Sequence, residues 1–405
     1  MTDGVDHGHE NHSFATRAVH SGERPRHPDF TPTTTPIYAT TSFSYAETAT
    51  LEAVFGQERH GYVYTRYGNP TVGALEAAVA ALEGTEGAIA LASGMAALHA
   101  AILVEVQAGS RIVAASDLYG ATRTLLVNVF GTLGIKTTFV DPLDLDAVRA
   151  AVDAVGPRLV LLETISNPLL RVPDLAAIVE IAHAARARVV VDNTFATPYL
   201  VSPAAFGADI VVHSATKYLA GHGDVIGGVI ATTEDRVLEL GELTKLTGAI
   251  LGPFEAWLTL RGIKTLPLRV RRQSDNAARV AAWLSANDRI GRVFYPGHDD
   301  LGDRARLFNH DLRGGLVAFE IAGAGTEGVA RFLQAMELCV PATTLGDVYT
   351  LALSPAMATH RGLTPDERAA IGIGDDLVRL ALGIEDPADI IADLDHALSA
   401  VPEAR

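Results

Sequence analysis

Short apolar runs alternate with segments of helical periodicity from about residue 70 onward, and this alternation restricts the fold more than any other feature of the sequence. The apolar runs lie at residues 112–113, 159–162, 189–191 and 210–212. Between the second and third runs, Leu175, Ile178 and Val179 recur at helical spacing. Apolar strands that alternate with amphipathic helices predict a parallel or mostly parallel sheet with helices on both faces.

Local signals predict where several elements begin. A helix is expected after Asn69, which can act as a cap, with Pro70 at the first helical position. Another helix is expected from the Ser-Gly-Met sequence at 93–95. The glycine pair at 227–228 is followed at once by the apolar run 229–231. We therefore expect this pair to lead into a further strand.

The chain divides into three regions by composition. Residues 1–65 are rich in Thr, Pro, Tyr and Ser, and their proline spacing excludes a long helix. This region is expected to be an extended arm of the kind that usually wraps a partner subunit, with packing on its own chain as the alternative. Residues 66–262 form the predicted large α/β domain, and residues 263–405 a smaller α+β domain. The smaller domain has a helical segment and two apolar strands at 268–284, 316–320 and 377–382.

Composition excludes several classes of function. The net charge of −16 over 405 residues argues against nucleic acid or an anionic membrane as partner. No segment is long and apolar enough to span a membrane. The single cysteine, Cys339, excludes a disulfide framework and is expected to be a packed thiol. Residues 1–12 lack the pattern of a signal peptide, so a cytoplasmic location is expected. We expect His7, His9 and His12 to belong to a disordered terminus, and no metal site.

Three strands are followed by polar residues. Glu163, Asp192 and Ser214 each come directly after an apolar run. In open α/β sheets, ligands bind beyond the carboxyl ends of the strands. The three residues therefore predict one common site.

The motif Ser-Ala-Thr-Lys-Tyr at 214–218 places Lys217 between the hydroxyls of Ser214 and Thr216 at this edge. A lysine alone could simply cap a strand. Together with Asp192, however, it supplies an amine for a Schiff base and a carboxylate for a pyridinium nitrogen. Pyridoxal phosphate requires these two groups of a protein.

Further residues can complete such a site. Gly94 permits an anion to approach a helix N-terminus. Tyr64 and Arg66 would lie on the same side of an extended segment and clamp a phosphate, unless they form a surface ladder. Tyr119 could stack on a cofactor ring and act as an acid, or be a core aromatic. Arg379, inside an apolar strand, needs an anionic partner, which could also be a structural ion pair.

Four motifs together resemble the Cys/Met-metabolism family of pyridoxal-phosphate enzymes. They are Ser-Gly-Met at 93–95, Glu-Thr-Ile-Ser-Asn-Pro at 163–168, Asp-Asn-Thr at 192–194 and the motif at 214–218. The likeness extends from residue 14 to residue 394. It implies the fold-type I pyridoxal-phosphate transferase fold, with pyridoxal 5′-phosphate as cofactor. It also implies a homotetramer built from dimers that share active sites.

The resemblance also implies roles for individual residues. Lys217 would bind the cofactor and act in catalysis with Tyr119, Asp192 would pair with the pyridinium nitrogen, and Asn167 would lie near the phenolic oxygen. The phosphate would be held by Ser93, Gly94, Met95, Ser214 and Thr216, with Tyr64 and Arg66 from the neighbouring subunit. The substrate would be held by Arg379, Thr344 and Asn167.

The family motifs are less specific for the reaction. Thr124 and Tyr349 stand where cystathionine enzymes typically carry an arginine and a glutamate, although Arg123 could compensate. Ala121 stands where methionine γ-lyases commonly carry a cysteine. The long insertion typical of O-acetylhomoserine sulfhydrylases is missing after the lysine region. We expect a carbon–sulfur γ-lyase acting on a sulfur amino acid. The alternative is a γ-replacement enzyme of the cystathionine γ-synthase or O-succinylhomoserine sulfhydrylase type.

Overall fold

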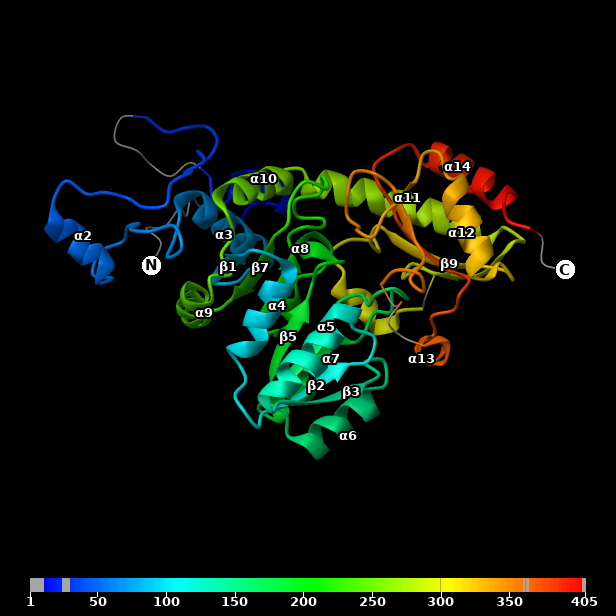
Figure 1. Cartoon of the computed structure of the whole chain (residues 1–405), viewed down its shortest axis with the longest axis horizontal. Coiled ribbons are helices and arrows are strands. Elements are labelled where there is room, and N and C mark those ends of the chain that lie inside the picture. The colour runs from blue at the N-terminus through cyan, green and yellow to red at the C-terminus, as the bar shows by residue number, and fades with distance from the viewer. Residues whose placement is uncertain (1–10, 24–29, 299, 360, 362–363, 403–405) are drawn as a thin grey trace.

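Two β-sheets organise the chain, and the helices pack around them (Figure 1). The computed structural model describes residues 11–23, 30–298, 300–359, 361 and 364–402. The expectation for His7 and His9 lies outside these residues. In the described part of the chain, no helix has the length and apolar character needed to cross a membrane.

The first sheet has seven strands in the order β1-β7-β6-β5-β4-β2-β3. Its strands are β1 (Gly87–Leu91), β2 (Arg111–Ala115), β3 (Lys136–Val140), β4 (Leu159–Glu163), β5 (Arg188–Asp192), β6 (Ile210–Ser214) and β7 (Gly228–Thr232). Neighbours from β3 to β6 pair in parallel, whereas β7 is antiparallel to both β6 and β1. The predicted mostly parallel sheet is confirmed. The edge strand β3 was not predicted, because its Lys-Thr-Thr-Phe-Val sequence is only half apolar.

Helices flank this sheet, and α3 (Pro70–Glu83) and α4 (Gly94–Leu103) begin where the local signals predict them. The others include α5 (Gly120–Thr124), α6 (Leu145–Val155), α7 (Leu175–Ala184), α8 (Thr197–Leu200), α9 (Glu234–Thr247) and α10 (Pro253–Ile263). The Asn69 side chain accepts a hydrogen bond from the Thr71 amide at 2.9 Å, as expected of a cap. Ser93 caps α4 in the same way, through the Ala96 amide at 3.1 Å.

The second sheet has five strands in the order β10-β11-β12-β9-β8 and is antiparallel except between β10 and β11. These strands are β8 (Ile290–Phe294), β9 (Leu316–Ile321), β10 (Val340–Pro341), β11 (Leu351–Leu353) and β12 (Leu377–Ala381). The accompanying helices are α11 (Leu266–Ser285), α12 (Gly325–Ala335), α13 (Pro365–Ala370) and α14 (Pro387–Ser399). Cys339 is buried beside this sheet, as expected of a packed thiol, and burial raises its pKa. The domain division at residue 262 stays a prediction.

The N-terminal region is less extended than its sequence predicts. Two short helices, α1 (Phe14–His20) and α2 (Thr48–Phe55), lie on either side of a helix-free stretch at 30–47. The prolines fall between the two helices, so the sequence excludes one long helix but allows two short ones. The Phe14 ring of α1 packs on Tyr199, with 5.3 Å between ring centroids. In contrast, α2 projects away from the body of the molecule, at the left of Figure 1.

Candidate active site

Glu163, Asp192 and Ser214 are the last residues of β4, β5 and β6. In the parallel register, Glu163 lies opposite Asp192, and Asp192 lies opposite Val212. Because β4, β5 and β6 run in the same direction, their carboxyl ends meet at one edge of the sheet. The structure therefore brings together the three strand ends that the sequence singled out.

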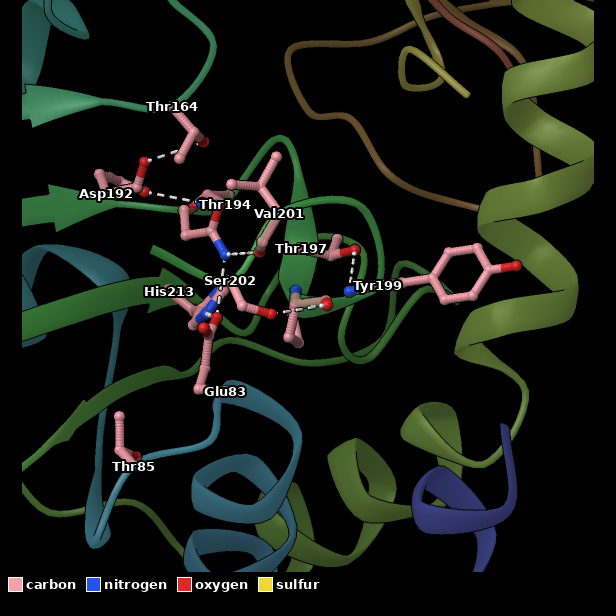
Figure 2. Close-up of polar contacts among 12 residues, drawn as sticks. Glu83, Thr85, Thr164, Asp192, Thr194, Thr197, Tyr199, Val201, Ser202 and His213 are labelled. Carbon is pink, nitrogen blue, oxygen red and sulfur yellow. Dashed lines mark hydrogen bonds and ion pairs between the residues drawn. The ribbon is translucent and has the colours of Figure 1, made fainter. Parts of the chain in front are cut away.

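Asp192 is a half-buried carboxyl group at the end of β5. One of its oxygens accepts a hydrogen bond from the Thr194 amide at 2.9 Å, and the Thr164 hydroxyl contacts its carbonyl oxygen (Figure 2). Burial raises the pKa of Asp192, whereas the hydrogen bonds from Thr194 and the nearby His213 lower it. A positively charged ligand group would favour the ionised form of such a carboxyl.

Glu163 is a buried carboxyl beside Asp192, and the sequence analysis gave it no role beyond marking the site. It accepts a hydrogen bond from the Tyr119 backbone amide at 2.7 Å. Burial, together with the negative charge of Asp192, raises the pKa of Glu163 well above its usual range. Glu163 thereby ties Tyr119 to the edge of the sheet, with the Tyr119 side chain 38% exposed.

Lys217 lies in the turn that follows β6. Its Nζ donates a hydrogen bond to the Thr344 hydroxyl at 2.7 Å. Burial, and then the positive charge of Arg379, lower the pKa of Lys217 to about 8. About a tenth of this amine is therefore neutral at pH 7, far more than for an ordinary lysine, and the neutral amine is the form that acts as a nucleophile or a base.

Arg379 reaches the same place from β12 of the second sheet. Its guanidinium donates to Asn167 Oδ1 at 2.9 Å and to the Thr344 carbonyl at 3.2 Å. It is only 3% exposed, and burial lowers its pKa to about 10. Its Nε has no hydrogen-bond partner, and no carboxylate of the described chain forms an ion pair with it. The alternative of a structural ion pair is thus wrong for these residues, and the charge remains available for an anion.

Backbone segments pack closely where the phosphate site was predicted. A Cβ atom on Gly94 would lie 2.7 Å from Ser214 Cβ, and one on Gly228 would lie 2.2 Å from the Ser93 carbonyl oxygen. Only glycine allows these approaches. The amide groups of Gly94 and Met95, in the first turn of α4, have no acceptor within the helix. They and the Ser214 hydroxyl form a cradle that fits an anion.

The Thr216 hydroxyl forms its hydrogen bonds with the backbone of Gly227. Its hydroxyl donates to the Gly227 carbonyl at 3.2 Å and accepts from the Gly227 amide at 3.0 Å. It therefore joins the turn that carries Lys217 to the segment leading into β7. Its predicted contact with the phosphate stays a prediction.

Tyr64 and Arg66 lie elsewhere in the chain. The expected extended segment is wrong, because the Tyr67 amide bonds to the Tyr64 carbonyl at 2.8 Å and closes a turn. The Arg66 guanidinium lies 5.6 Å from the Tyr64 ring centroid and donates to the Lys245 carbonyl in α9. These contacts are with the arm and α9, whereas Lys217 contacts Thr344. The two groups thus contact different parts of the chain.

Arg269 in α11 supports the site but was missed by the sequence analysis. Its guanidinium donates to the carbonyls of Tyr218 and Gly262, both at 2.8 Å, and it is 4% exposed. It thus ties the turn after Lys217 to α10. An arginine on a helix gives little local signal, since most arginines on helices are solvated.

The assembled groups fit pyridoxal phosphate. A lysine amine of lowered pKa, a half-buried carboxylate and an anion cradle lie around one sheet edge. The cofactor needs these three groups for its aldehyde, its pyridine nitrogen and its phosphate. Among the described residues, no cluster of three or more His, Cys, Asp or Glu side chains could hold a metal ion.

Comparison with known proteins agrees with this chemistry. The family model described as Cys/Met metabolism PLP-dependent enzyme matches residues 15–399. An L-methionine gamma-lyase of Porphyromonas gingivalis is 42% identical, over 96% of this chain and 97% of that protein. An O-succinylhomoserine sulfhydrylase of Pseudomonas aeruginosa is 38% identical, over 98% of each. The crystal structure of cystathionine gamma-lyase from Lactobacillus plantarum complexed with L-serine matches with a TM-score of 0.88 and 35% identity, over 96% of this chain and 99% of that one. The chain belongs to the Cys/Met-metabolism family of enzymes that depend on pyridoxal phosphate.

Proposed function

We propose that the protein is a carbon–sulfur γ-lyase that converts methionine, homocysteine or cystathionine to 2-oxobutanoate, ammonia and a thiol. One observation carries the proposal. The Lys217 amine, with its pKa lowered to about 8, is joined through Thr344 to the guanidinium of Arg379, which forms no ion pair with a carboxylate of the described residues. This arrangement offers a base and a carboxylate grip, as an α-amino acid requires. Relatives named L-methionine gamma-lyase support the choice of reaction.

In this proposal each side chain of the site has a distinct role in the reaction. Bound pyridoxal phosphate would supply an electron sink for negative charge at the substrate α-carbon. Arg379 binds the α-carboxylate, and Asp192 holds the pyridine nitrogen. Lys217 Nζ takes the proton from the α-carbon and returns protons to the substrate. The Tyr119 hydroxyl gives a proton to the leaving sulfur.

The second candidate is γ-replacement, in which an O-acylhomoserine reacts with a thiol. The similarity to the O-succinylhomoserine sulfhydrylase favours it.

The residues of α5 and their contacts bear on whether cystathionine is a substrate. The Thr124 hydroxyl donates back to the Gly120 carbonyl at 2.9 Å, and the Arg123 guanidinium stacks 3.9 Å from the Phe139 ring centroid. In this arrangement the Arg123 guanidinium does not take the place of the arginine that cystathionine enzymes typically carry at the position of Thr124.

The test measures 2-oxobutanoate released by the purified, cofactor-loaded protein. L-methionine and L-cystathionine are supplied separately, and then O-succinyl-L-homoserine with a thiol. We expect rapid release from methionine. Thioether formation from the acylated substrate, with no 2-oxobutanoate from either amino acid, would replace the lyase by the replacement enzyme.

We also propose that two copies complete each active site, within a homotetramer. Arg66 contacts α9 and lies beside the Tyr64 ring, so we infer that these two residues reach a cofactor bound to Lys217 in another subunit. The turn that carries them is partly exposed, with Tyr64 and Tyr67 at 43% and 42%, and the nearby Phe55 is 63% exposed. An aromatic surface of this kind is typical of one covered by another protein. The cytoplasmic location stays a prediction from the sequence.

Complementation tests this assembly. Lys217→Ala and Arg66→Ala should each be inactive alone. After the two are unfolded and refolded together, mixed dimers contain one site with both native residues, so part of the activity should return. No recovery in mixed dimers, whose presence is checked by native mass spectrometry, would contradict shared sites.

A further inference from the structure

A buried carboxylate lies behind the site, at the end of helix α3. Glu83 is the last residue of α3, and its side chain has no solvent exposure. Burial disfavours its charge, and so does the negative end of the helix dipole. Two donors offset this cost at one oxygen of Glu83, namely His213 Nε2 at 2.5 Å and Asn193 Nδ2 at 2.9 Å (Figure 2). The other oxygen of Glu83 and His213 Nδ1 are buried and have no hydrogen-bond partner among the described residues.

Both donors are chain neighbours of residues in the active site. Asn193 follows Asp192, and His213 precedes Ser214 in β6. Consecutive residues of a strand point to opposite faces of the sheet. Accordingly, Ser214 packs against Gly94 of α4, whereas His213 contacts Glu83 of α3. The cluster therefore lies behind the strand ends that form the site.

Hydrogen bonds join the cluster to Asp192. The Asn193 amide donates to the Val212 carbonyl at 2.8 Å, and the Ser214 amide donates to the Thr194 hydroxyl at 2.8 Å. The Thr194 amide in turn donates to Asp192 at 2.9 Å. The ends of β5 and β6 are thus held as one unit, and a change at His213 is transmitted to Asp192 over a short path.

We propose that Glu83 and His213 act as a positioning pair for Asp192. Glu83 holds His213 as an imidazolium, and this positive charge keeps Asp192 ionised, so that Asp192 can keep a proton on the pyridine nitrogen of the cofactor. The inference depends on the cofactor of the family, but not on whether the enzyme eliminates or replaces. Failure of the lyase assay would therefore leave it intact.

The other charged groups near Asp192 agree with this arrangement. Burial raises the pKa of Asp192, and the positive charge of His213 opposes that rise. Glu163 faces Asp192 from β4, and burial together with the negative charge of Asp192 raises its pKa, which favours the uncharged form of Glu163. Asp117 faces Glu163 and forms an ion pair with Arg171 at 3.5 Å. In the proposed arrangement, charge would alternate from Glu83 to His213 to Asp192, and the pyridinium would continue the series.

The first test measures the wild-type enzyme and uses one variant only to assign a signal. Nitrogen-15 NMR of the labelled, cofactor-loaded enzyme reports the protonation of each imidazole, and the His213 signal is assigned by its loss in His213→Gln. We expect both nitrogens of His213 to carry a proton at neutral pH. A neutral His213 would overturn the proposal.

The second test follows the cofactor itself. Glu83→Gln keeps the size of the side chain and an acceptor oxygen, but removes its charge. With nitrogen-15 in the pyridine ring, the ring signal should move toward that of a neutral pyridine, because the proton shifts to Asp192. His213→Gln should move it equally, and the double variant should move it no further. A ring signal unchanged from wild type in either folded variant would overturn the proposal.

A matched control separates this effect from lost stability. Glu105 is also a buried carboxyl, at 4% exposure, and it pairs with Arg236 at 2.9 Å away from the strand ends. Glu105→Gln should lower the unfolding temperature without moving the ring signal. An equal movement in this control would show that the pair has only a structural role.

Discussion

The two sheets contribute to the active site in different ways. The parallel part of the first sheet supplies residues at its strand ends, where Glu163, Asp192 and Ser214 meet. The antiparallel second sheet supplies Arg379 from the interior of β12, where Leu353 and Ala318 flank it in the register. A parallel sheet thus gathers functional groups at one edge, whereas an antiparallel sheet contributes a side chain where it packs against its neighbour.

One chain of hydrogen bonds joins the two contributions. It runs from Lys217 to the hydroxyl of Thr344, and from the carbonyl of Thr344 through Arg379 to Asn167. In the proposed function, the first sheet binds the cofactor and moves protons, and the second holds the substrate. Variants on the two sides should therefore fail in different ways.

The largest effect is expected at Lys217, on the side of the first sheet. Lys217→Ala should lower kcat by about ten-thousand-fold or more, since both the Schiff base and the proton transfers are lost. The visible absorbance band of the bound cofactor should also vanish. Lys136→Ala, at an exposed position of β3, is the control and should keep both. A retained band in Lys217→Ala would contradict the assignment of the amine.

The next effect is expected at Tyr119, which Glu163 ties to the same edge. Tyr119→Phe should lower kcat by roughly a hundredfold to a thousandfold, because the acid for the leaving group is lost. The KM for the amino acid should change little, as the ring remains. Tyr349→Phe removes a hydroxyl from another exposed tyrosine, 58% accessible, and should be nearly neutral. Equal losses in the two variants would remove the special role of Tyr119.

A smaller effect of a different kind is expected at Arg379, on the side of the second sheet. Arg379→Gln should lower kcat/KM by about a hundredfold, the result of losing about 3 kcal/mol of charged hydrogen bonding to the carboxylate. The loss should appear mainly in KM, with the visible band intact. If the band disappeared as in Lys217→Ala, the division of work between the sheets would be wrong.

The pH dependence of cofactor capture sharpens the link between the two sides. Lys217 attacks the cofactor aldehyde as the neutral amine, and its pKa in the folded protein is lowered to about 8 from 10.5. Capture by the cofactor-free protein should therefore quicken as pH rises through about 8, and then level off. Arg379→Gln removes a nearby cation, so the midpoint should move to higher pH. Stopped-flow absorbance measures both, and a shift to lower pH would contradict the coupling.

The smallest effect concerns substrate choice. Thr124→Arg together with Tyr349→Glu restores the two polar groups of the cystathionine enzymes at partly exposed positions. We expect release of 2-oxobutanoate from cystathionine, relative to methionine, to rise about fivefold, as a few new polar contacts allow. Leu133→Glu, at a position 49% exposed, is the control for added charge. An unchanged ratio would place the determinants of specificity elsewhere.

Much of the first sheet could be predicted from the sequence, because its signals are local. Apolar runs marked β4, β5 and β6, and the polar residue that ends each of them was visible at once. Asn69 and Ser93 marked helix starts through caps that act within three residues. The strands β3, β10 and β11 were not predicted. Partial exposure weakens the periodic signal of the edge strand β3, and short length weakens that of β10 and β11.

The turn at Tyr64 shows a different kind of failure. Alternate spacing of Tyr64 and Arg66 indicated an extended segment, but a backbone hydrogen bond from Tyr67 closes a turn there. Spacing describes how side chains would lie if the backbone were extended, and it does not determine the backbone conformation. The role of Tyr64 and Arg66 in a neighbouring subunit comes from the family resemblance and stays a prediction.

The sequence by itself determined the family, the mostly parallel sheet and the strand ends that gather the reactive groups, because each depends on residues close together in the chain. Only the tertiary structure decided which distant groups meet. Arg379 and Asn167 are 212 residues apart, and His213 and Glu83 are 130 apart. Their charges matter because burial removes water from around them, and burial is a property of the packed molecule rather than of any segment.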